Sequence, residues 1–348
     1  MTKPQSTYES AHIRAIDLFC GAGGSSYGAR LAGVEIAAAF DIWQPAVDTF
    51  NCNFGAGVAR QADIFELDIE ALHAELGRID LILASPECTN HSKAKGKGIR
   101  CERSRETALE VVRFAEIFKP RWVVIENVVE MQGWHRHDEL KQRLKELDYK
   151  VTEQELDAEV FGVAQSRKRL FMLCALADTP PVPTDVRLNA RTAREIVSTN
   201  RYKLNQLRIQ KRAEATLAKA DYAIAQMQSE GKPLEPFLIV YYGSAKNGGN
   251  GGWQSLDRPL RTITTLDRFG YVAPGPSREQ DRMRMLQPEE LKLAMGYGDD
   301  FVFAEGLPRR DKIKLMGNGV CPPVMKAIVE NLTRSWQGDS KESLQIDR

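Results

Sequence analysis

The sequence predicts an α/β fold, with a mostly parallel sheet covered by helices on both faces and a smaller second domain. Short apolar runs alternate with amphipathic, helix-length stretches between residues 13 and 176. Such alternation is typical of βαβ units. The proline-rich segment DTPPVPTDV, residues 178–186, interrupts the alternation and indicates a domain boundary. With 348 residues, the chain is long enough to form two domains.

The first domain is predicted over residues 13–180, and its elements follow one another along the chain. Strands are predicted where apolar runs have strand length, at residues 13–19, 35–40, 80–85, 121–128 and 169–176. Amphipathic spacing predicts helices, most clearly at residues 102–118 and 137–148. Ligands of such sheets bind beyond the carboxyl ends of the strands, so we expect functional residues directly after each predicted strand.

The remainder of the chain mixes shorter elements. After residue 186 the pattern predicts a basic helical stretch to about residue 230, a strand at 236–243, a glycine-rich loop at 244–253, a β-like run at 259–265, and helices at 287–297 and 324–336. We assign residues 187–285 to the second domain and 286–336 to a hinge and a C-terminal helix that return to the first domain. The polar termini, residues 1–12 and 337–348, are predicted to be disordered.

Positive charge is concentrated in one stretch. Residues 187–219 contain nine Lys or Arg and two Glu, a local excess of seven positive charges, although the whole chain has a net charge of +1. The excess is typical of a nucleic-acid-binding surface and equally of a solvated helix face, and charge alone does not separate the two.

Composition excludes several classes of protein. No apolar run reaches membrane-spanning length and the N-terminal residues contain no hydrophobic signal core, so we expect a cytoplasmic protein without a membrane partner. The six cysteines are never spaced as C-x-x-C. We therefore expect reduced thiols and no metal site.

Three strand ends carry residues that suit an adenosine-type cofactor. The first predicted strand runs into the glycine-rich stretch CGAGG, residues 20–24, where the missing Cβ lets the backbone approach a ligand. The second ends at Asp41, whose carboxylate can accept hydrogen bonds from ribose hydroxyls. Asp63 and Ile64 follow in the third unit and offer a polar edge and an apolar face for adenine. Each feature alone is better explained as a cap or a core residue, but three in register favour a cofactor.

Reactive side chains follow the next two predicted strands. Cys88 lies in SPEC, and a thiolate in such a loop is a strong nucleophile. Its alternative role is that of a small buried residue, which its polar neighbours disfavour. Glu126 ends the fifth strand and can donate a proton from a desolvated cleft, or can be a structural acid bonded to backbone N–H groups. In QSRKR, period-two alternation predicts Arg167 and Arg169 on one face.

Taken in order, DLFCGAGG, SPEC, ENV, QSRKR, RPLRTITT and GNGVCPP resemble the motifs of the DNA cytosine-5 methyltransferase family, from about residue 14 to 335. The resemblance implies a class I S-adenosylmethionine-dependent methyltransferase fold whose second domain recognises the target. It also implies S-adenosylmethionine as cofactor, double-stranded DNA as partner, and a monomer that acts either with a cognate restriction endonuclease or alone. The implied cofactor-binding residues are Phe19, Gly21, Gly23, Gly24, Asp41, Ile42, Asp63, Ile64, Ser85 and Asn318.

The resemblance also implies the catalytic roles. Cys88 would add to C6 of a cytosine flipped out of the duplex, Glu126 would hydrogen-bond N3 and the exocyclic amine, and Arg167 and Arg169 would steady the base and its loop. The chemistry independently requires these residue types, because C5 of cytosine is too weak a nucleophile to take a methyl group directly. Addition of a thiolate at C6 creates an enamine whose C5 is nucleophilic.

One motif departs from the family. This chain has Glu87-Cys88-Thr89 where the family usually has Pro-Cys-Gln. A carboxylate beside the thiol in a dry pocket would make it a poorer nucleophile. Consecutive side chains of an extended loop diverge, which favours Glu87 pointing away from Cys88.

The departure leaves two alternative functions open. One is a family member that binds DNA and cofactor without the usual turnover. The other is a methyltransferase acting on RNA cytosine, although the Cys-Phe-Thr element of the tRNA-methylating branch is absent from the sequence. A nucleotide-dependent oxidoreductase is disfavoured, because the dinucleotide-binding spacing G-x-G-x-x-G is also absent.

Overall fold

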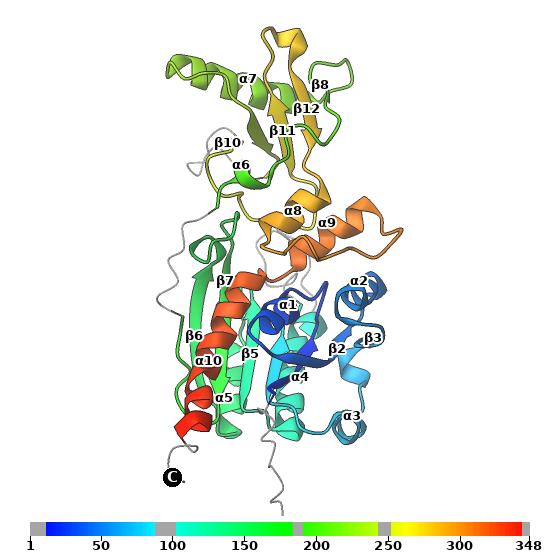
Figure 1. Cartoon of the computed structure of the whole chain (residues 1–348), viewed down its shortest axis with the longest axis vertical. Coiled ribbons are helices and arrows are strands. Elements are labelled where there is room, and N and C mark those ends of the chain that lie inside the picture. Colours follow the sequence, from blue (N-terminus) through cyan, green and yellow to red (C-terminus); the bar gives the residue numbers. More distant parts are fainter. Residues whose placement is uncertain (1–11, 88–101, 184–190, 243–251, 343–348) are drawn as a thin grey trace, which may run out of the picture. The chain divides into compact units, whose positions relative to one another are not determined.

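The computed structural model describes residues 12–87, 102–183, 191–242 and 252–342, and the chain divides into two compact units (Figure 1). The first unit comprises residues 1–156, 168–186 and 320–348, and the second comprises residues 157–167 and 187–319. Residues 157–167, which the sequence pattern assigns to the first domain, thus group with the second unit. Their backbone explains this, because Ser166 N donates to the Leu260 carbonyl at 2.8 Å and Leu260 N donates to that of Ala164 at 2.8 Å.

A seven-stranded sheet in the order β3-β2-β1-β4-β5-β7-β6 forms the centre of the first unit. Neighbouring strands from β3 to β5 run parallel, and β7 is antiparallel to β5. The predicted α/β fold with a mostly parallel sheet is therefore confirmed. The strands in chain order are β1 (Arg14–Leu18), β2 (Glu35–Asp41), β3 (Ala59–Gln61), β4 (Leu81–Ala84), β5 (Trp122–Asn127), β6 (Lys150–Asp157) and β7 (Lys168–Ala175).

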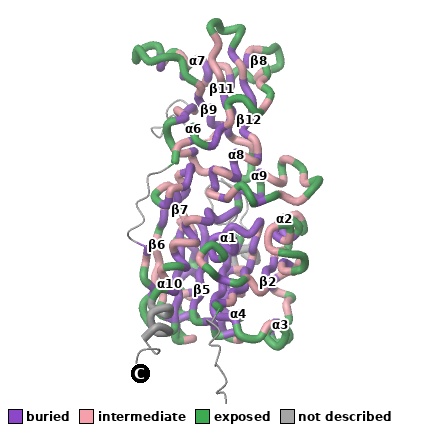
Figure 2. Tube along the Cα trace, viewed as in Figure 1, coloured by how far each residue is buried: buried purple, intermediate pink, exposed green. Residues whose placement is uncertain are grey.

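Three helices share an apolar core with alternate residues of this sheet: α3 (Ile69–Leu76), α4 (Glu102–Phe118) and α5 (His137–Glu146). Strands β4 and β5 are buried along their whole length, as expected of strands covered on both faces (Figure 2). Helix α4 buries side chains at the i, i+3, i+4, i+7 spacing of a helical face: Val111, Phe114, Ala115 and Phe118.

Helix α1 (Gly24–Leu31) packs against α10 (Pro322–Glu342), and Figure 1 shows the two side by side. The approach is close because Gly28 has no side chain, and a Cβ there would lie 2.4 Å from the Pro322 carbonyl oxygen. Helix α10 reaches Glu342, whereas the sequence predicts a disordered tail from residue 337. A nucleated helix gains one hydrogen bond for each residue it adds, which favours its continuation.

Helix α2 and three short 3-10 turns complete the first unit's edge and its crossovers. Helix α2 packs its Phe50 into a small core with β2 and β3. The elements are α2 (Gln44–Phe54), η1 (Ile64–Glu66), η3 (Val129–Gly133) and, where the chain enters the second unit, η4 (Ala158–Val160). No helix in the described ranges is both long and apolar enough to cross a membrane.

The second unit contains a five-stranded antiparallel sheet in the order β10-β9-β11-β12-β8. One face packs on helix α7, and the shared core includes Ala220, Phe237 and Val272. The strands are β8 (Asn205–Gln206), β9 (Phe237–Val240), β10 (Trp253–Ser255), β11 (Phe269–Ala273) and β12 (Arg282–Met285). The helices are α6 (Ala193–Ile196), α7 (Glu214–Ser229), α8 (Pro288–Ala294) and α9 (Arg309–Asn318), with a 3-10 turn η6 (Arg278–Gln280).

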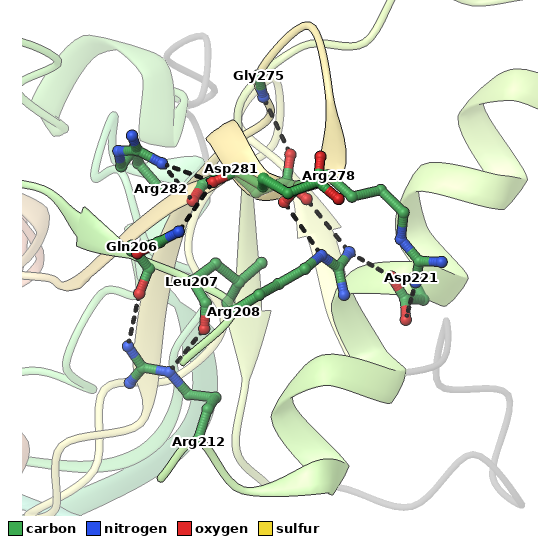
Figure 3. A network of polar contacts seen from close by, with 10 residues as sticks. Gln206, Leu207, Arg208, Arg212, Asp221, Gly275, Arg278, Asp281 and Arg282 are labelled. Atoms are coloured by element: carbon green, nitrogen blue, oxygen red, sulfur yellow. Dashed lines mark hydrogen bonds and ion pairs between the residues drawn. The ribbon is translucent and has the colours of Figure 1, made fainter. Parts of the chain in front are cut away.

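The predicted basic helical stretch up to about residue 230 is helical only in part. Only α6 and α7 are helical in the described part of that stretch, and the chain between them is irregular apart from β8. Arg208 there bonds to Asp221 and, at 3.2 Å, to Asp281, and Arg212 donates to the Leu207 carbonyl at 3.2 Å (Figure 3). These tertiary bonds hold the chain in a path that no single helix could follow.

The predicted β-like run at 259–265 is also not a strand. It forms one isolated bridge, between Leu260 and Gln165. Side chains satisfy backbone groups that a ladder would use, since the Gln165 Oε1 atom accepts from Ile263 N at 2.8 Å. The Thr262 hydroxyl donates in turn to the Ser166 carbonyl at 3.0 Å.

Candidate active site

The glycine-rich turn after β1 is held in a conformation that favours glycine. Phe19, Gly21 and Gly23 have φ values of 60°, 53° and 89°, in the left-handed region. Gly23 N donates to the Cys20 carbonyl at 2.8 Å, and Gly24 begins α1. A Cβ on Gly23 would lie 2.8 Å from the Phe54 ring, so the turn packs against α2 without room for a side chain. The turn therefore presents backbone rather than side chains at the carboxyl end of β1.

Asp41, at the end of β2, braces this turn. Its Oδ2 atom accepts from Gly21 N at 2.8 Å, and its Oδ1 atom accepts from Trp43 N at 2.9 Å. A carboxylate oxygen offers two acceptor sites, so this residue type suits a ligand hydroxyl at the end of a strand. The neighbouring Ile42 is 65% exposed, which is high for a large apolar side chain.

The third strand end combines a cap with a core residue. The Asp63 Oδ1 atom accepts from Phe65 N at 3.1 Å and caps η1. Ile64 is buried and belongs to the main core of the first unit. Both residues thus have structural roles at this strand end. Asp63 and Asp41 lie on neighbouring segments, because Ala62 N donates to the Asp41 carbonyl at 3.0 Å.

Asp17 is a buried acid that sequence reasoning missed. Its Oδ2 atom accepts from the Ser26 hydroxyl at 2.6 Å, and its Oδ1 atom has no hydrogen-bond partner among the described residues. Burial raises the pKa of Asp17 to about 7, an effect that the hydrogen bond from Ser26 opposes and the charge of Asp41 reinforces. The available signal was an acid inside the apolar run RAIDL.

The end of β4 carries Ser85, whose hydroxyl lies 3.5 Å from that of Ser25 in α1. Pro86 is buried, and its carbonyl accepts from the Asn127 side chain at 3.1 Å, which ties the SPEC segment to the end of β5. Glu87 is exposed, so its carboxylate is in contact with water. Cys88 and Thr89 lie outside the described residues.

Glu126 and Arg169 form the candidate acidic centre of the first unit. The Arg169 Nε atom lies 3.1 Å from the Glu126 Oε1 atom, with side chains 15% and 7% exposed. The two residues come from adjacent antiparallel strands, β5 and β7. A guanidinium at this distance fixes the position of the carboxylate, and burial strengthens their interaction.

The structure gives Arg167 different partners from Arg169. Arg167 precedes β7, so the alternation of a strand does not apply to it, and it is buried in the second unit. It donates from Nη1 to the Ile263 carbonyl at 3.0 Å and from Nη2 to the Gly317 carbonyl at 2.8 Å. Asn318, the last residue of α9 in the same unit, is exposed. Arg167 therefore ties the segment that leads to Asn318 to the segment around Ile263.

Two buried cysteines of the first unit, Cys20 and Cys174, have different surroundings from a reactive thiol. Burial raises the pKa of the Cys20 thiol well above its ordinary value, with Asp17 and Asp41 adding to the effect. Burial also raises the pKa of Cys174. Both thiols stay protonated near neutral pH and are poor nucleophiles. In the described ranges, no group of three or more His, Cys, Asp or Glu side chains is placed to hold a metal ion.

Comparisons with known proteins match nearly the whole chain. The family model "C-5 cytosine-specific DNA methylase" matches residues 13–334. The Type II methyltransferase M.HindV of Haemophilus influenzae is 32% identical over 322 residues, covering 88% of this chain and 92% of that protein. M.HgiDI of Herpetosiphon aurantiacus is 34% identical over 166 residues, covering 46% of this chain; that alignment spans about half of M.HgiDI, 52% of its length.

Solved structures share the fold. The crystal structure of S. pombe Dnmt2 methyltransferase superposes with a TM-score of 0.67 and 16% identity, covering 93% of this chain and 99% of that one. The Entamoeba histolytica methyltransferase EhMeth gives a TM-score of 0.66 and 17% identity, with the same coverage. At these identities the likeness concerns architecture, and confirms the class I methyltransferase fold.

Proposed function

Since the chain belongs to the C-5 cytosine-specific DNA methylase family, we propose that it methylates C5 of cytosine in double-stranded DNA through a covalent bond from Cys88. The family catalyses methylation of DNA cytosine with S-adenosylmethionine as methyl donor. The observation that carries the catalytic assignment is the buried Glu126–Arg169 pair, at 3.1 Å. A paired carboxyl group at a strand end suits recognition of the N3 edge of cytosine.

The residues of the first unit fit the cofactor. S-adenosylmethionine carries a sulfonium and an amino group at one end and an adenosine at the other, and it supplies an electrophilic methyl group when bound. The Gly23 turn has no room for a side chain, and Asp41 braces it by accepting from Gly21 N. Asp17 is fully buried, and when ionised it adds negative charge close to Asp41, which favours a cationic group at this turn. Phe19, Ile42, Asp63, Ile64 and Ser85 complete the proposed set in the first unit, and Asn318 is its proposed member in the second unit.

The chemistry then follows from the side chains. The Cys88 thiolate adds to C6 while Glu126 holds the N3 edge, which places electron density on C5. C5 would take the methyl group as the bond from methyl to the donor's sulfonium sulfur breaks and leaves a neutral thioether. C5 would then lose its proton to a base, and the C6–sulfur bond to Cys88 would break to restore the aromatic ring. Arg169 keeps Glu126 in place and steadies the base, and we assign to Arg167 the positioning of the loop around Ile263.

The biological setting is also a proposal. M.HindV and M.HgiDI are named Type II methyltransferases, which supports a role in a restriction-modification system with a cognate restriction endonuclease as partner. We infer that the chain acts as a monomer, because one polypeptide supplies every proposed catalytic residue. We also infer a cytoplasmic location, where the DNA substrate of a Type II system lies.

The function is tested with purified protein, methyl-labelled S-adenosylmethionine and mixed-sequence duplex DNA, with tRNA as the alternative substrate. We expect label to appear as 5-methylcytosine in DNA, resolved by mass spectrometry of the nucleosides, and to vanish with Cys88→Ser. The matched control is Cys52→Ser, an exposed cysteine on α2. Label in tRNA alone would favour the RNA alternative. No transfer to either despite cofactor and DNA binding would favour a member without turnover.

A further inference from the structure

We propose that an arginine-lined cavity of the second unit binds a phosphate of the DNA backbone. The inference rests on the proposed function, because it names a binding surface for the same substrate. The cavity has a volume of about 400 Å³, and the residues of its wall that matter here are Ser166, Trp253, Gln254, Arg258 and Arg261.

The basic stretch singled out in the sequence is not the best phosphate-binding surface. Its described arginines are largely bound to acids within the second unit: Arg191 to Glu195 at 3.1 Å, Arg194 to Asp257 at 2.6 Å and to Glu235, and Arg208 to Asp221 and Asp281. An arginine that already has a carboxylate partner must share or lose that partner to bind a phosphate, and this reduces the binding free energy that the new contact contributes. Three arginines of this stretch therefore already hold carboxylate partners inside the second unit.

Arg258 and Arg261 differ in this respect. Among the described residues, neither guanidinium has a carboxylate partner. Arg258 is exposed, Arg261 is half-buried, and both line the same cavity. Two arginines that line one space, neither of them held by a carboxylate partner, offer the planar donor arrays that bind phosphate oxygens well.

The segment that carries the two arginines is fixed in place. Gln254 is buried; its Nε2 atom donates to the Pro259 carbonyl at 3.1 Å, and its Oε1 atom accepts from Arg261 N at 3.3 Å. Trp253 is held by a bond from its Nε1 atom to Gln226 Oε1 at 3.3 Å. A fixed segment loses little conformational freedom on binding, so it favours a pre-formed site.

Charge on the remaining wall sets the class of ligand. Glu230 is neutralised by Lys232 at 2.6 Å, which leaves Glu159 as the acid opposing the two arginines. The balance is a small positive excess, which suits one singly charged phosphodiester better than a free phosphate of higher charge. A DNA backbone supplies such groups in series, and contacts to them position a protein on the duplex.

The test measures DNA binding by fluorescence anisotropy as a function of salt concentration, using the full-length protein. We expect Arg258→Ala with Arg261→Ala to weaken binding about tenfold at low salt. The slope of log K against log salt should become shallower by roughly one to two. Glu159→Gln should tighten binding about twofold, because it removes the opposing charge. At saturating DNA, kcat should be unchanged, since the contact is equal in ground and transition states.

Two comparisons make the result decisive. Arg191→Ala removes an exposed arginine that is already paired, and it should leave the salt slope unchanged. The double variant Arg258→Lys with Arg261→Lys keeps both positive charges and should retain most of the salt slope. This result would show that the alanine variant binds more weakly because it lost charge and not because it misfolded. An unchanged slope in the double alanine variant of a protein that methylates DNA would overturn the cavity assignment alone. The cavity assignment would also be overturned if the double alanine variant lost salt dependence on duplex RNA but not on duplex DNA. The proposed function would be overturned if the wild-type protein failed to methylate DNA.

Discussion

Arg169 and Glu126 form an ion pair between two strands, and this makes the pair testable at the level of one side chain. Arg169→Ala removes this cation from beside the buried carboxylate. We expect kcat to fall at least about tenfold, because a positioned acid typically contributes on the order of 10²- to 10⁴-fold. Cofactor affinity, measured by calorimetry, should stay the same. Arg60→Ala, which breaks the exposed pair with Glu75, is the matched control and should change neither quantity.

The raised pKa of Asp17 lets us predict how cofactor binding depends on pH. Its pKa is raised to about 7 in the protein without cofactor, mainly by burial, so the carboxyl is largely neutral below that pH and ionised above it. A cationic cofactor favours the ionised form, and below about pH 7 binding must also remove a proton. Affinity should therefore weaken up to about tenfold for each pH unit below 7 and level off above it. Titration calorimetry from pH 6 to 8 measures this.

Asp17→Asn provides the comparison for that pH profile. The amide keeps the shape and a hydrogen bond to Ser26, but it does not titrate. Its affinity should be lower above pH 7 and nearly independent of pH in this window. Identical profiles for the two proteins would mean that another group causes the dependence.

The close packing of α1 on α10 requires a residue without a side chain at position 28. A Cβ on Gly28 would lie 2.4 Å from the Pro322 carbonyl oxygen and 2.8 Å from Met325 Cβ, and backbone atoms cannot move aside cheaply. We expect Gly28→Ala to lower the free energy of unfolding by about 1–3 kcal/mol. It should also weaken cofactor binding, because α1 begins directly after the Gly23 turn. Chemical denaturation and calorimetry measure the two effects.

Gly133→Ala is the control for that helix contact. No atom lies within 4 Å of a Cβ built on Gly133, and its φ is not in the left-handed region. This substitution should therefore leave both stability and cofactor affinity close to those of the wild type. A similar loss of stability in both variants would mean that the α1–α10 contact is not the cause.

For the whole molecule, the sequence predicts the first unit better than the second. Its strands and helices arise from contiguous runs, so the helix predicted at 102–118 coincides with α4 and the strand predicted at 121–128 contains β5. In the second unit, long-range partners decide the path. Arg208 bonds to acids 13 and 73 residues further along the chain, which no local spacing reveals.

The candidate site shows the same contrast. The predicted strands are enough to place Asp41 and Glu126 at strand ends, because a parallel sheet brings the carboxyl ends of its strands to one edge. The ion pair between Glu126 and Arg169, the carbonyl partners of Arg167 and the burial of Asp17 depend on tertiary packing. A single acid in an apolar run is visible in the sequence, but its neighbours are not.

The bonds of Arg208 also bear on protein engineering (Figure 3). Exchanging recognition segments between relatives is a natural way to build hybrid enzymes of altered specificity. In this chain two arginines of the basic stretch pair with acids encoded far from them, Arg194 with Asp257 and Arg208 with Asp281. A hybrid that received only the arginine or only the acid of such a pair would contain a charged side chain without its ion-pair partner. Viable hybrids should therefore inherit both halves together, and their crossover points should fall outside residues 194–281.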